Sequence, residues 1–170
     1  MSELKIGDRA PDFEGLDNTG KRIALSDFRG HKLILFFYPG DFTPICTMEA
    51  CNLRDNYAAL RDKGFDVLGV SADTVSKHGL FVDKHRLPFR LLADLKREVI
   101  TKYGAWGRKG IWRLFSFGVR RFTFIIDEEG IIIAMVRNVK SRSHAQQLMK
   151  ILETIGEVGK SSALNSALAF

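Results

Sequence analysis

The sequence is poor in cysteine and has no long hydrophobic run. Only two cysteines occur among its 170 residues, and they lie five positions apart, at Cys46 and Cys51. The longest apolar run, residues 33–38, has the length of a strand and falls well short of the roughly 20 residues that a membrane span needs. The chain has neither a thioredoxin-type C-x-x-C motif nor a second cysteine pair for zinc. These absences argue against a membrane protein, a zinc domain and a general disulfide reductase.

The first residues also lack an apolar segment and a cleavage pattern, so a secretory signal is not predicted. We therefore expect a cytoplasmic protein with no membrane association. In a reducing compartment, a lone cysteine pair points to catalysis, redox chemistry or metal binding before it points to a structural disulfide. Metal binding is the weaker reading, because the four histidines are scattered without ligand spacing: His31, His78, His85 and His144.

Charge gives a second candidate function. Hydrophobic residues make up 45% and charged residues 27% of the chain, as in an ordinary globular protein, and the net charge is +6. Part of the excess lies in residues 108–121, "RKGIWRLFSFGVRR", which combine basic and aromatic side chains without an acid. Such a segment could bind nucleic acid or a protein partner, but no nucleic-acid motif accompanies it, so nucleic acid is not the predicted partner.

The chain alternates between strand and helix patterns without an internal repeat. Apolar runs rich in β-branched residues predict strands, and capping residues and glycines mark the helix ends. Predicted strands are residues 32–38, 65–73 and 89–94; predicted helices are Pro44 to Lys63, Thr74 to His85, Leu95 to Tyr103 and His144 to Val158; and residues 121–139 form a hairpin. This order predicts one α/β domain over residues 1–158, followed by a tail at 159–170 that is disordered or docked on the surface.

The two cysteines lie on the helix predicted to begin at Pro44. Thr43 suits the N-cap, and Pro44 suits the first helical position because a proline there loses no hydrogen bond. Cys46 then falls in the first turn, where free N–H groups and the positive end of the helix dipole stabilise a thiolate. The apolar face of this helix comprises Cys46, Ala50, Leu53, Tyr57 and Leu60, so Cys46 also begins the buried stripe.

Cys51 lies about 100° round the helix from that stripe. Residues five apart on an ideal helix have Cα atoms roughly 8–9 Å apart, whereas a disulfide needs about 4.4–6.8 Å. Either the two thiols never bond, or the first turns unwind when they do. On position alone, two small buried hydrophobic residues remain an equally good interpretation.

The segment "FYPGDFTPICTMEACNLRD" strongly resembles the peroxidatic-cysteine segment of peroxiredoxins of the bacterioferritin-comigratory or Q-type branch. The family pattern P-x-x-x-T-x-x-C corresponds here to Pro39, Thr43 and Cys46, and the branch often has a second cysteine at the position of Cys51. "IGDRAPDF" (6–13), "LSDFRG" (25–30), "VLGVSADTVSKHGLF" (67–81) and "RFTFIIDEEG" (121–130) also resemble family segments, and the likeness covers residues 4–157.

This resemblance implies a thioredoxin-like fold, a central mixed sheet flanked by helices with an N-terminal β extension. It also implies thiol-dependent reduction of hydrogen peroxide and organic hydroperoxides without metal or haem, by a monomer or weak homodimer. Cys46 would attack the peroxide and become a sulfenic acid, and Cys51 would condense with it to a disulfide that a thioredoxin-type protein reduces. Arg121 and Thr43 would hold the peroxide oxygens, and Pro39 would shield the sulfenic acid.

Each implied role has a plainer alternative. Thr43 can be a helix cap alone, and Arg121 can be a surface arginine, with Arg120 adjacent to it. Glu49, at a position that is commonly acidic in the family, can be a solvated helix residue. A redox-sensing or interaction module that uses the basic segment 108–121 is the alternative function.

The sequence departs from the family pattern at two positions. Ile45 stands where the branch usually has glycine, and Gly40 stands where lysine is common. A β-branched residue before Cys46 makes the first turn bulkier and stiffer, which affects substrate access and the ease of unwinding.

Overall fold

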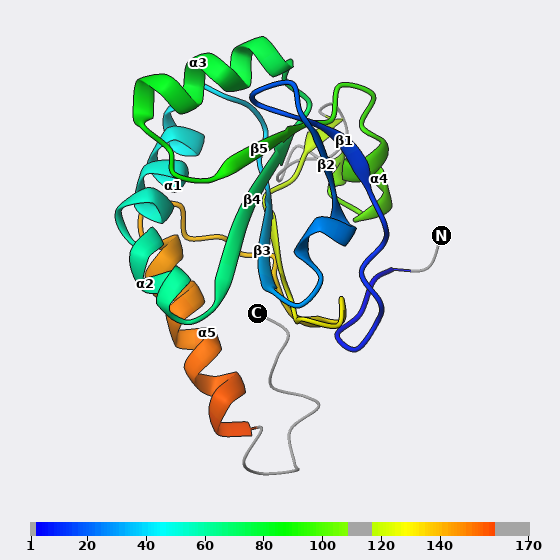
Figure 1. Cartoon of the computed structure of the whole chain (residues 1–170), viewed down its shortest axis with the longest axis vertical. Coiled ribbons are helices and arrows are strands. Elements are labelled where there is room, and N and C mark those ends of the chain that lie inside the picture. Colours follow the sequence, from blue (N-terminus) through cyan, green and yellow to red (C-terminus); the bar gives the residue numbers. More distant parts are fainter. Residues whose placement is uncertain (1–2, 109–116, 159–170) are drawn as a thin grey trace.

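The computed structural model describes residues 3–108 and 117–158 (Figure 1). The predicted tail at 159–170 and most of the basic segment 108–121 lie outside these residues. The interaction module proposed for that segment is therefore not tested by the structure. None of the helices within the described residues combines the length and apolar character of a membrane span.

Seven strands form one mixed sheet in the order β2-β1-β5-β4-β3-β8-β9. The central strands β3, β4 and β5 are parallel, whereas β8 runs antiparallel to β3, and β1 runs antiparallel to β5. The strands are β1 (Glu14–Asp17), β2 (Arg22–Ala24), β3 (Lys32–Phe37), β4 (Phe65–Ser71), β5 (Arg90–Ala93), β8 (Phe122–Ile126) and β9 (Ile132–Val136), and a separate pair is formed by β6 (Trp106–Arg108) and β7 (Phe117–Val119). This is the predicted α/β fold with its N-terminal β extension, β1 and β2.

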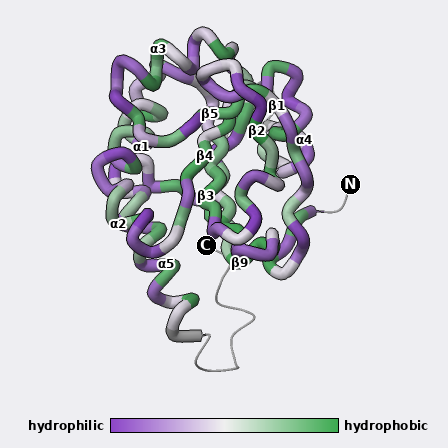
Figure 2. Tube along the Cα trace, in the orientation of Figure 1, coloured by the Kyte–Doolittle hydropathy of each residue, from purple (hydrophilic) through white to green (hydrophobic). Residues whose placement is uncertain are grey.

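Helices cover both faces of the sheet (Figure 1). They are η1 (Leu25–Phe28), α1 (Pro44–Asp55), α2 (Tyr57–Asp62), α3 (Val75–His85), α4 (Glu98–Lys102) and α5 (His144–Val158). Alternate residues of β3 point to opposite faces. Ile34 and Phe36 pack with α1, α2, α3 and α5, whereas Leu33 and Leu35 pack with α4 and η1. Hydrophobic residues accordingly concentrate along the central strands (Figure 2).

Close contact between β3, β4 and β5 depends on Gly69. A Cβ at this position would lie 2.7 Å from side-chain atoms of both Leu91 and Phe36. A larger residue at position 69 would therefore push these two side chains apart.

The helix predicted from Pro44 to Lys63 is wrong in one respect, because it is divided at Asn56 into α1 and α2. The Asn56 side-chain amide donates to the carbonyl of Asn52 at 2.8 Å. That carbonyl would accept the backbone N–H of Asn56 in a continuous helix, so the side chain competes with the helical bond.

The helix predicted from Leu95 to Tyr103 is also shorter than expected, since α4 begins only at Glu98. The Asp94 carboxylate accepts hydrogen bonds from the backbone N–H groups of Glu98 (3.0 Å) and Ile100 (2.7 Å). These bonds fix the start of α4, and residues 95–97 form a turn in which Arg97 has a φ of 61°. The Thr74 hydroxyl caps α3, because it accepts from the Lys77 N–H at 3.2 Å.

Candidate active site

The candidate site lies at the carboxyl end of β3, where residues 38–43 lead into α1. Pro44 occupies the first turn of α1, as predicted, and Cys46 follows in the same turn. The Cys46 side chain packs among apolar residues beneath the helix and is only 1% exposed. The thiol is thus placed where helix N–H groups favour a negative charge and where bulk water is largely excluded.

Thr43 is the N-cap residue of α1 by its backbone, but its side chain does not cap the helix. The hydroxyl instead donates to the Gly40 carbonyl at 3.0 Å. A capping role for the Thr43 hydroxyl is therefore wrong. The hydroxyl closes the loop that precedes Cys46, and it lies on the exposed side of that loop.

Arg121, just before β8, meets Cys46 although 75 residues separate them. One guanidinium nitrogen donates to Cys46 Sγ at 3.1 Å, and the other donates to Glu49 Oε2 at 2.7 Å. The neighbouring Arg120 donates to the Gly104 carbonyl instead. A fixed guanidinium in contact with the sulfur stabilises a thiolate and can hold an anionic oxygen beside it.

Glu49 is fully buried, so its interpretation as a solvated helix residue is wrong. Burial raises the pKa of Glu49 to about 7, although the Arg121 guanidinium beside it favours the carboxylate. The physical cause is that Oε1 lies in the interior without a hydrogen-bond donor, which penalises the charged form.

His144, the first residue of α5, lies on the other side of Glu49. Its Nε2 is 3.9 Å from Glu49 Oε1 and 2.8 Å from the Thr123 hydroxyl. Burial lowers the pKa of His144 to about 4, so the ring is neutral at neutral pH. Cys46, Arg121 and Glu49 are thus joined by hydrogen bonds, and His144 lies next to Glu49 without bonding to it.

A second buried polar cluster fixes the loop before Cys46. Asp41 contacts His78 Nδ1 through Oδ2 at 2.7 Å and accepts the Tyr38 hydroxyl on Oδ1 at 2.5 Å. Burial raises the pKa of Tyr38, so the phenol keeps the proton that it donates. His78 Nε2 lies 3.1 Å from the Leu92 carbonyl, which can only accept. Both ring nitrogens of His78 therefore face oxygen atoms, and the ring links the Asp41 loop to β5.

Oxygen and nitrogen atoms of Asp41, Asp73 and His78 lie within 4.8 Å of one another, a spacing compatible with a metal ion. These atoms already have hydrogen-bond partners. Asp73 Oδ2 accepts from the Asp41 N–H and from the Ser71 hydroxyl, and Asp73 Oδ1 accepts from Lys77. The donor set is thus satisfied by the protein, and we interpret the cluster as an anchor for the loop.

Cys51 has different surroundings from Cys46. It is half-buried, and both cysteines are free thiols in the structure. Cys51 Sγ lies 3.8 Å from Nδ1 of His85, the last residue of α3. The structure thus pairs Cys46 with an arginine and Cys51 with a histidine.

Two further positions singled out in the sequence, Pro39 and Ile45, lie on the loop before α1 and in its first turn. Pro39 lies two residues after the end of β3 and is partly buried. Ile45 is 51% exposed, so its bulk stands at the surface beside the buried Cys46.

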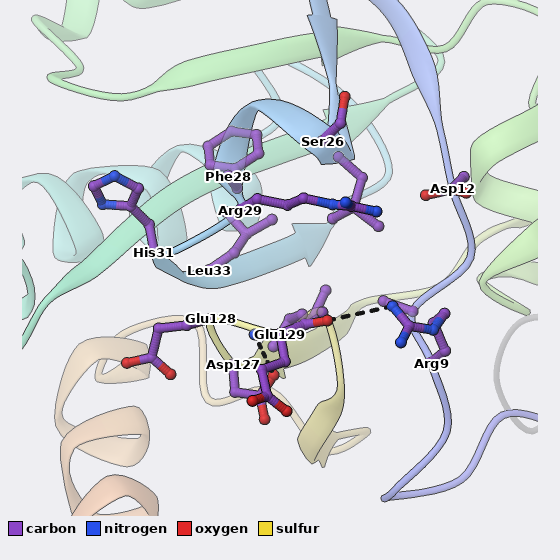
Figure 3. Close-up of a pocket in the computed structure, with 14 residues that line it drawn as sticks. Arg9, Asp12, Ser26, Phe28, Arg29, His31, Leu33, Asp127, Glu128 and Glu129 are labelled. Atoms are coloured by element: carbon purple, nitrogen blue, oxygen red, sulfur yellow. Dashed lines mark hydrogen bonds between the residues drawn. The ribbon is translucent and has the colours of Figure 1, made fainter.

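The hollow shown in Figure 3 is unrelated to the cysteines. It has a volume of about 30 Å³, enough for about one water molecule, and lies between η1 and the turn that joins β8 to β9. Arg9 donates to the Glu129 carbonyl at its rim. This hollow lies at the amino end of β3, whereas the cysteines follow the carboxyl end.

Sequence reasoning missed the contacts of His78, His85 and His144, because it judged the histidines only by metal-ligand spacing. A usable signal was present in α3. His78, Phe81 and His85 are spaced by three and four residues, so they share one face of that helix. The rings of Phe81 and His85 are indeed in contact, with centroids 5.0 Å apart.

Comparison with known proteins identifies relatives over most of the chain. The model of the AhpC/TSA family matches residues 6–135. Peroxiredoxin Bcp of Bacillus subtilis is 38% identical over 154 residues, which cover 91% of this chain and 98% of the relative.

Two solved structures have the same fold. The crystal structure of a PrxQ mutant from Xylella fastidiosa has a TM-score of 0.84 at 26% identity and covers 92% of this chain and 99% of its own. A structure described under the alkyl peroxide reduction activity of the Xanthomonas campestris bacterioferritin comigratory protein has a TM-score of 0.78 at 27% identity. That match covers 84% of this chain and 90% of the other.

Proposed function

The chain belongs to the AhpC/TSA family, among its Bcp/PrxQ peroxiredoxins, and on this premise we propose that Cys46 is the thiolate that attacks the peroxide. As a peroxiredoxin, the protein is a thiol-dependent peroxidase with a thioredoxin-type fold. The observation that carries the assignment is the 3.1 Å contact of Arg121 with Cys46 Sγ at the start of α1.

In the first step, Cys46 Sγ attacks one peroxide oxygen, the O–O bond breaks, and the sulfur becomes a sulfenic acid. The leaving oxygen takes a proton and departs as water or an alcohol. Arg121 holds the developing charge with donors that are already oriented, because its other nitrogen is bound to Glu49. Thr43, whose hydroxyl is fixed to Gly40, contributes to orienting the peroxide, and Pro39 limits the access of water to the sulfenic acid.

In the second step, Cys51 attacks the Cys46 sulfenic acid to form a disulfide. Both thiols lie on α1, and their spacing on an intact helix is too long for an S–S bond. The first turn of α1 therefore has to unwind. A thioredoxin-type protein then reduces the disulfide, and hydroperoxides are the substrates. A monomer or weak homodimer and a cytoplasmic location belong to the same proposal.

Stopped-flow reaction of the reduced protein with hydrogen peroxide tests the role of Cys46. We expect Cys46→Ser to abolish the reaction and Cys51→Ser to leave the first step intact. A Cys46→Ser variant that consumes peroxide at the wild-type rate would show that the assignment is wrong.

Mass spectrometry after one equivalent of peroxide tests the role of Cys51 separately. We expect an intramolecular disulfide with the loss of both free thiols. A stable Cys46 sulfenic acid beside a free Cys51 thiol would refute the resolving role while leaving the peroxidatic role untouched.

A further inference from the structure

We propose that His85 is the base that takes the proton from Cys51 when the disulfide forms. The inference deepens the proposed function and rests on Cys51 being the resolving thiol. It starts from the contact between Cys51 Sγ and His85 Nδ1 at 3.8 Å, which is within hydrogen-bonding reach for sulfur. His85 lies 34 residues after Cys51, at the end of a different helix.

The His85 ring is held in place by aromatic neighbours. It packs edge-on against the buried Phe81 ring, with centroids 5.0 Å apart at 68°. Its centroid also lies 6.3 Å from the ring of Phe42, in the loop before α1. These contacts fix the ring beside Cys51 and leave the sulfur as the polar group near Nδ1.

Arg54 joins the two helices at the same place. It lies one turn after Cys51 on α1, and its guanidinium donates to the His85 carbonyl at 2.7 Å. Arg54 therefore positions His85 beside Cys51.

The protonation state of His85 suits a base. Partial burial, with the positive charges of Lys84 and Arg54, lowers the pKa of His85. The charged and titratable groups that face the ring are Cys51 and Arg54 from α1 and Lys84 from α3, and each of the two cations favours the neutral ring. A neutral imidazole carries one nitrogen lone pair, which can accept the proton of a thiol.

Disulfide formation joins the two sulfurs and releases one molecule of water. Cys51 Sγ attacks Cys46 Sγ, an S–S bond forms, and the S–O bond of the sulfenic acid breaks. The hydroxide that leaves takes a proton and becomes water, and the Cys51 proton passes to His85 Nδ1 and from there to solvent. The Cys51 sulfur is oxidised, and the sulfenic sulfur is reduced by the same amount. Because Cys51 lies beyond the first turn of α1, it can stay beside His85 while Cys46 moves.

An upper limit for the effect follows from ordinary thiol chemistry. A thiol with a pKa of about 8.5 is roughly 3% thiolate at pH 7, so a base that supplies the thiolate can accelerate the attack by at most about 30-fold. We expect His85→Asn to slow disulfide formation by up to about 30-fold at pH 7, and to have little effect near pH 10, where a free thiol ionises unaided.

The test is stopped-flow measurement of both steps between pH 6.5 and 10, with sulfenic acid and disulfide identified by quenching and mass spectrometry. Sulfenic acid formation should be unchanged in His85→Asn, and the matched control His31→Asn, at an exposed histidine, should match the wild type in both steps. For the wild type, the second step should be nearly independent of pH from 7 to 8. In His85→Asn its rate should rise about tenfold per unit.

Several outcomes would overturn the proposal. One is a wild-type second step that already rises about tenfold per pH unit near neutrality, a result that needs no variant. Another is a His85→Asn rate that equals the wild type at pH 7, or that is reduced by the same factor at pH 7 and pH 10, which indicates a structural effect only. If no disulfide forms in the wild type, the resolving role of Cys51 itself fails, and that result is distinct from a slow disulfide in His85→Asn.

Discussion

The two cysteines share one short helix, yet their surroundings prepare them for different chemistry. Cys46 is buried, and its sulfur accepts a hydrogen bond from Arg121. Cys51 is half-buried and lies beside the imidazole of His85. Five residues turn a helix by about 140° beyond a full turn, so one thiol faces β8 and the other faces α3. A cation stabilises a thiolate in advance, whereas a base removes a proton at the moment of attack.

In the proposed mechanism, this difference separates the two steps of the reaction in space. Groups around Cys46 should control the reaction with peroxide, and groups around Cys51 should control disulfide formation. The loop that carries Asp41 supports the groups around Cys46, because it leads directly into the first turn of α1. Substitutions around each cysteine should therefore change either the rate of one step or the stability of the fold.

The largest effect is expected from His78→Gln, beneath the loop that leads to Cys46. This substitution removes the ring that contacts Asp41 and the Leu92 carbonyl, and each buried polar atom left without a partner typically costs about 1–3 kcal/mol in the free energy of unfolding. Urea unfolding measures this loss. The matched control is Lys77→Gln, whose side chain is 46% exposed and pairs with Asp73, and which should lose no more than about 1 kcal/mol. Equal losses in the two variants would mean that the cluster does not anchor the loop.

Arg121→Met should remove the cation from Cys46 and slow only the first step. Loss of an oriented donor to a developing charge typically reduces rates by about 10²–10³-fold, and we expect this loss in the second-order rate constant with peroxide. Measurement at pH 6 keeps Glu49 mostly protonated, so the variant leaves little buried charge behind.

Arg120→Met is the matched control, because that side chain donates to the Gly104 carbonyl and should leave the rate nearly unchanged. If Arg120→Met is the slower of the two variants, Arg121 is not the residue that activates Cys46.

Glu49→Gln should change how stability depends on pH. The pKa of Glu49 is about 7 in the folded protein against an ordinary value of 4.5, so between these values the folded state holds a proton that the unfolded state has lost. In the wild type, the contribution of Glu49 to the free energy of unfolding is complete below pH 4.5. It falls by on the order of 3 kcal/mol as the pH rises through 7. Glutamine mimics the protonated acid and has no such loss.

The stability of Glu49→Gln relative to wild type should therefore rise between pH 5 and pH 8 in urea unfolding. His144, with a pKa of about 4, contributes a dependence of opposite sign, but it is present in both proteins. The control variant is Glu128→Gln, which makes the same change at an exposed carboxylate. A pH-independent difference between Glu49→Gln and wild type would show that Glu49 is ionised throughout.

The smallest effect is expected from Ile45→Gly at the exposed edge of the first turn. Glycine is less favourable in a helix than isoleucine by roughly 0.5 kcal/mol, so unwinding should become about twofold easier and the disulfide should form correspondingly faster. Ile45→Ala should act in the opposite direction, because alanine favours the helix. Stopped-flow rates of the second step measure both. If both variants change the rate of disulfide formation in the same direction, unwinding is not part of this step.

The order of strands and helices could be predicted from the sequence because periodicity and capping are local properties. The strand at β3, the start of α1 and the cap of α3 are read from neighbouring residues. The errors arose where a side chain forms a hydrogen bond with the backbone at a helix end. Asn56 divides the predicted helix, and Asp94 sets the late start of α4. The pair β6 and β7 was not predicted, since each has only three residues.

The sequence alone was enough to place Cys46 in the first turn of a helix, because the preference of Pro44 for the first helical position is a local property. The tertiary structure decided which groups meet the two thiols. Arg121 reaches Cys46 across 75 residues because β8 pairs with β3 in a fixed register, and His85 reaches Cys51 because α3 packs beside α1. Helix starts depend on short-range hydrogen bonds, whereas the protonation of Glu49 and the partner of Cys51 depend on burial and on contacts between distant segments.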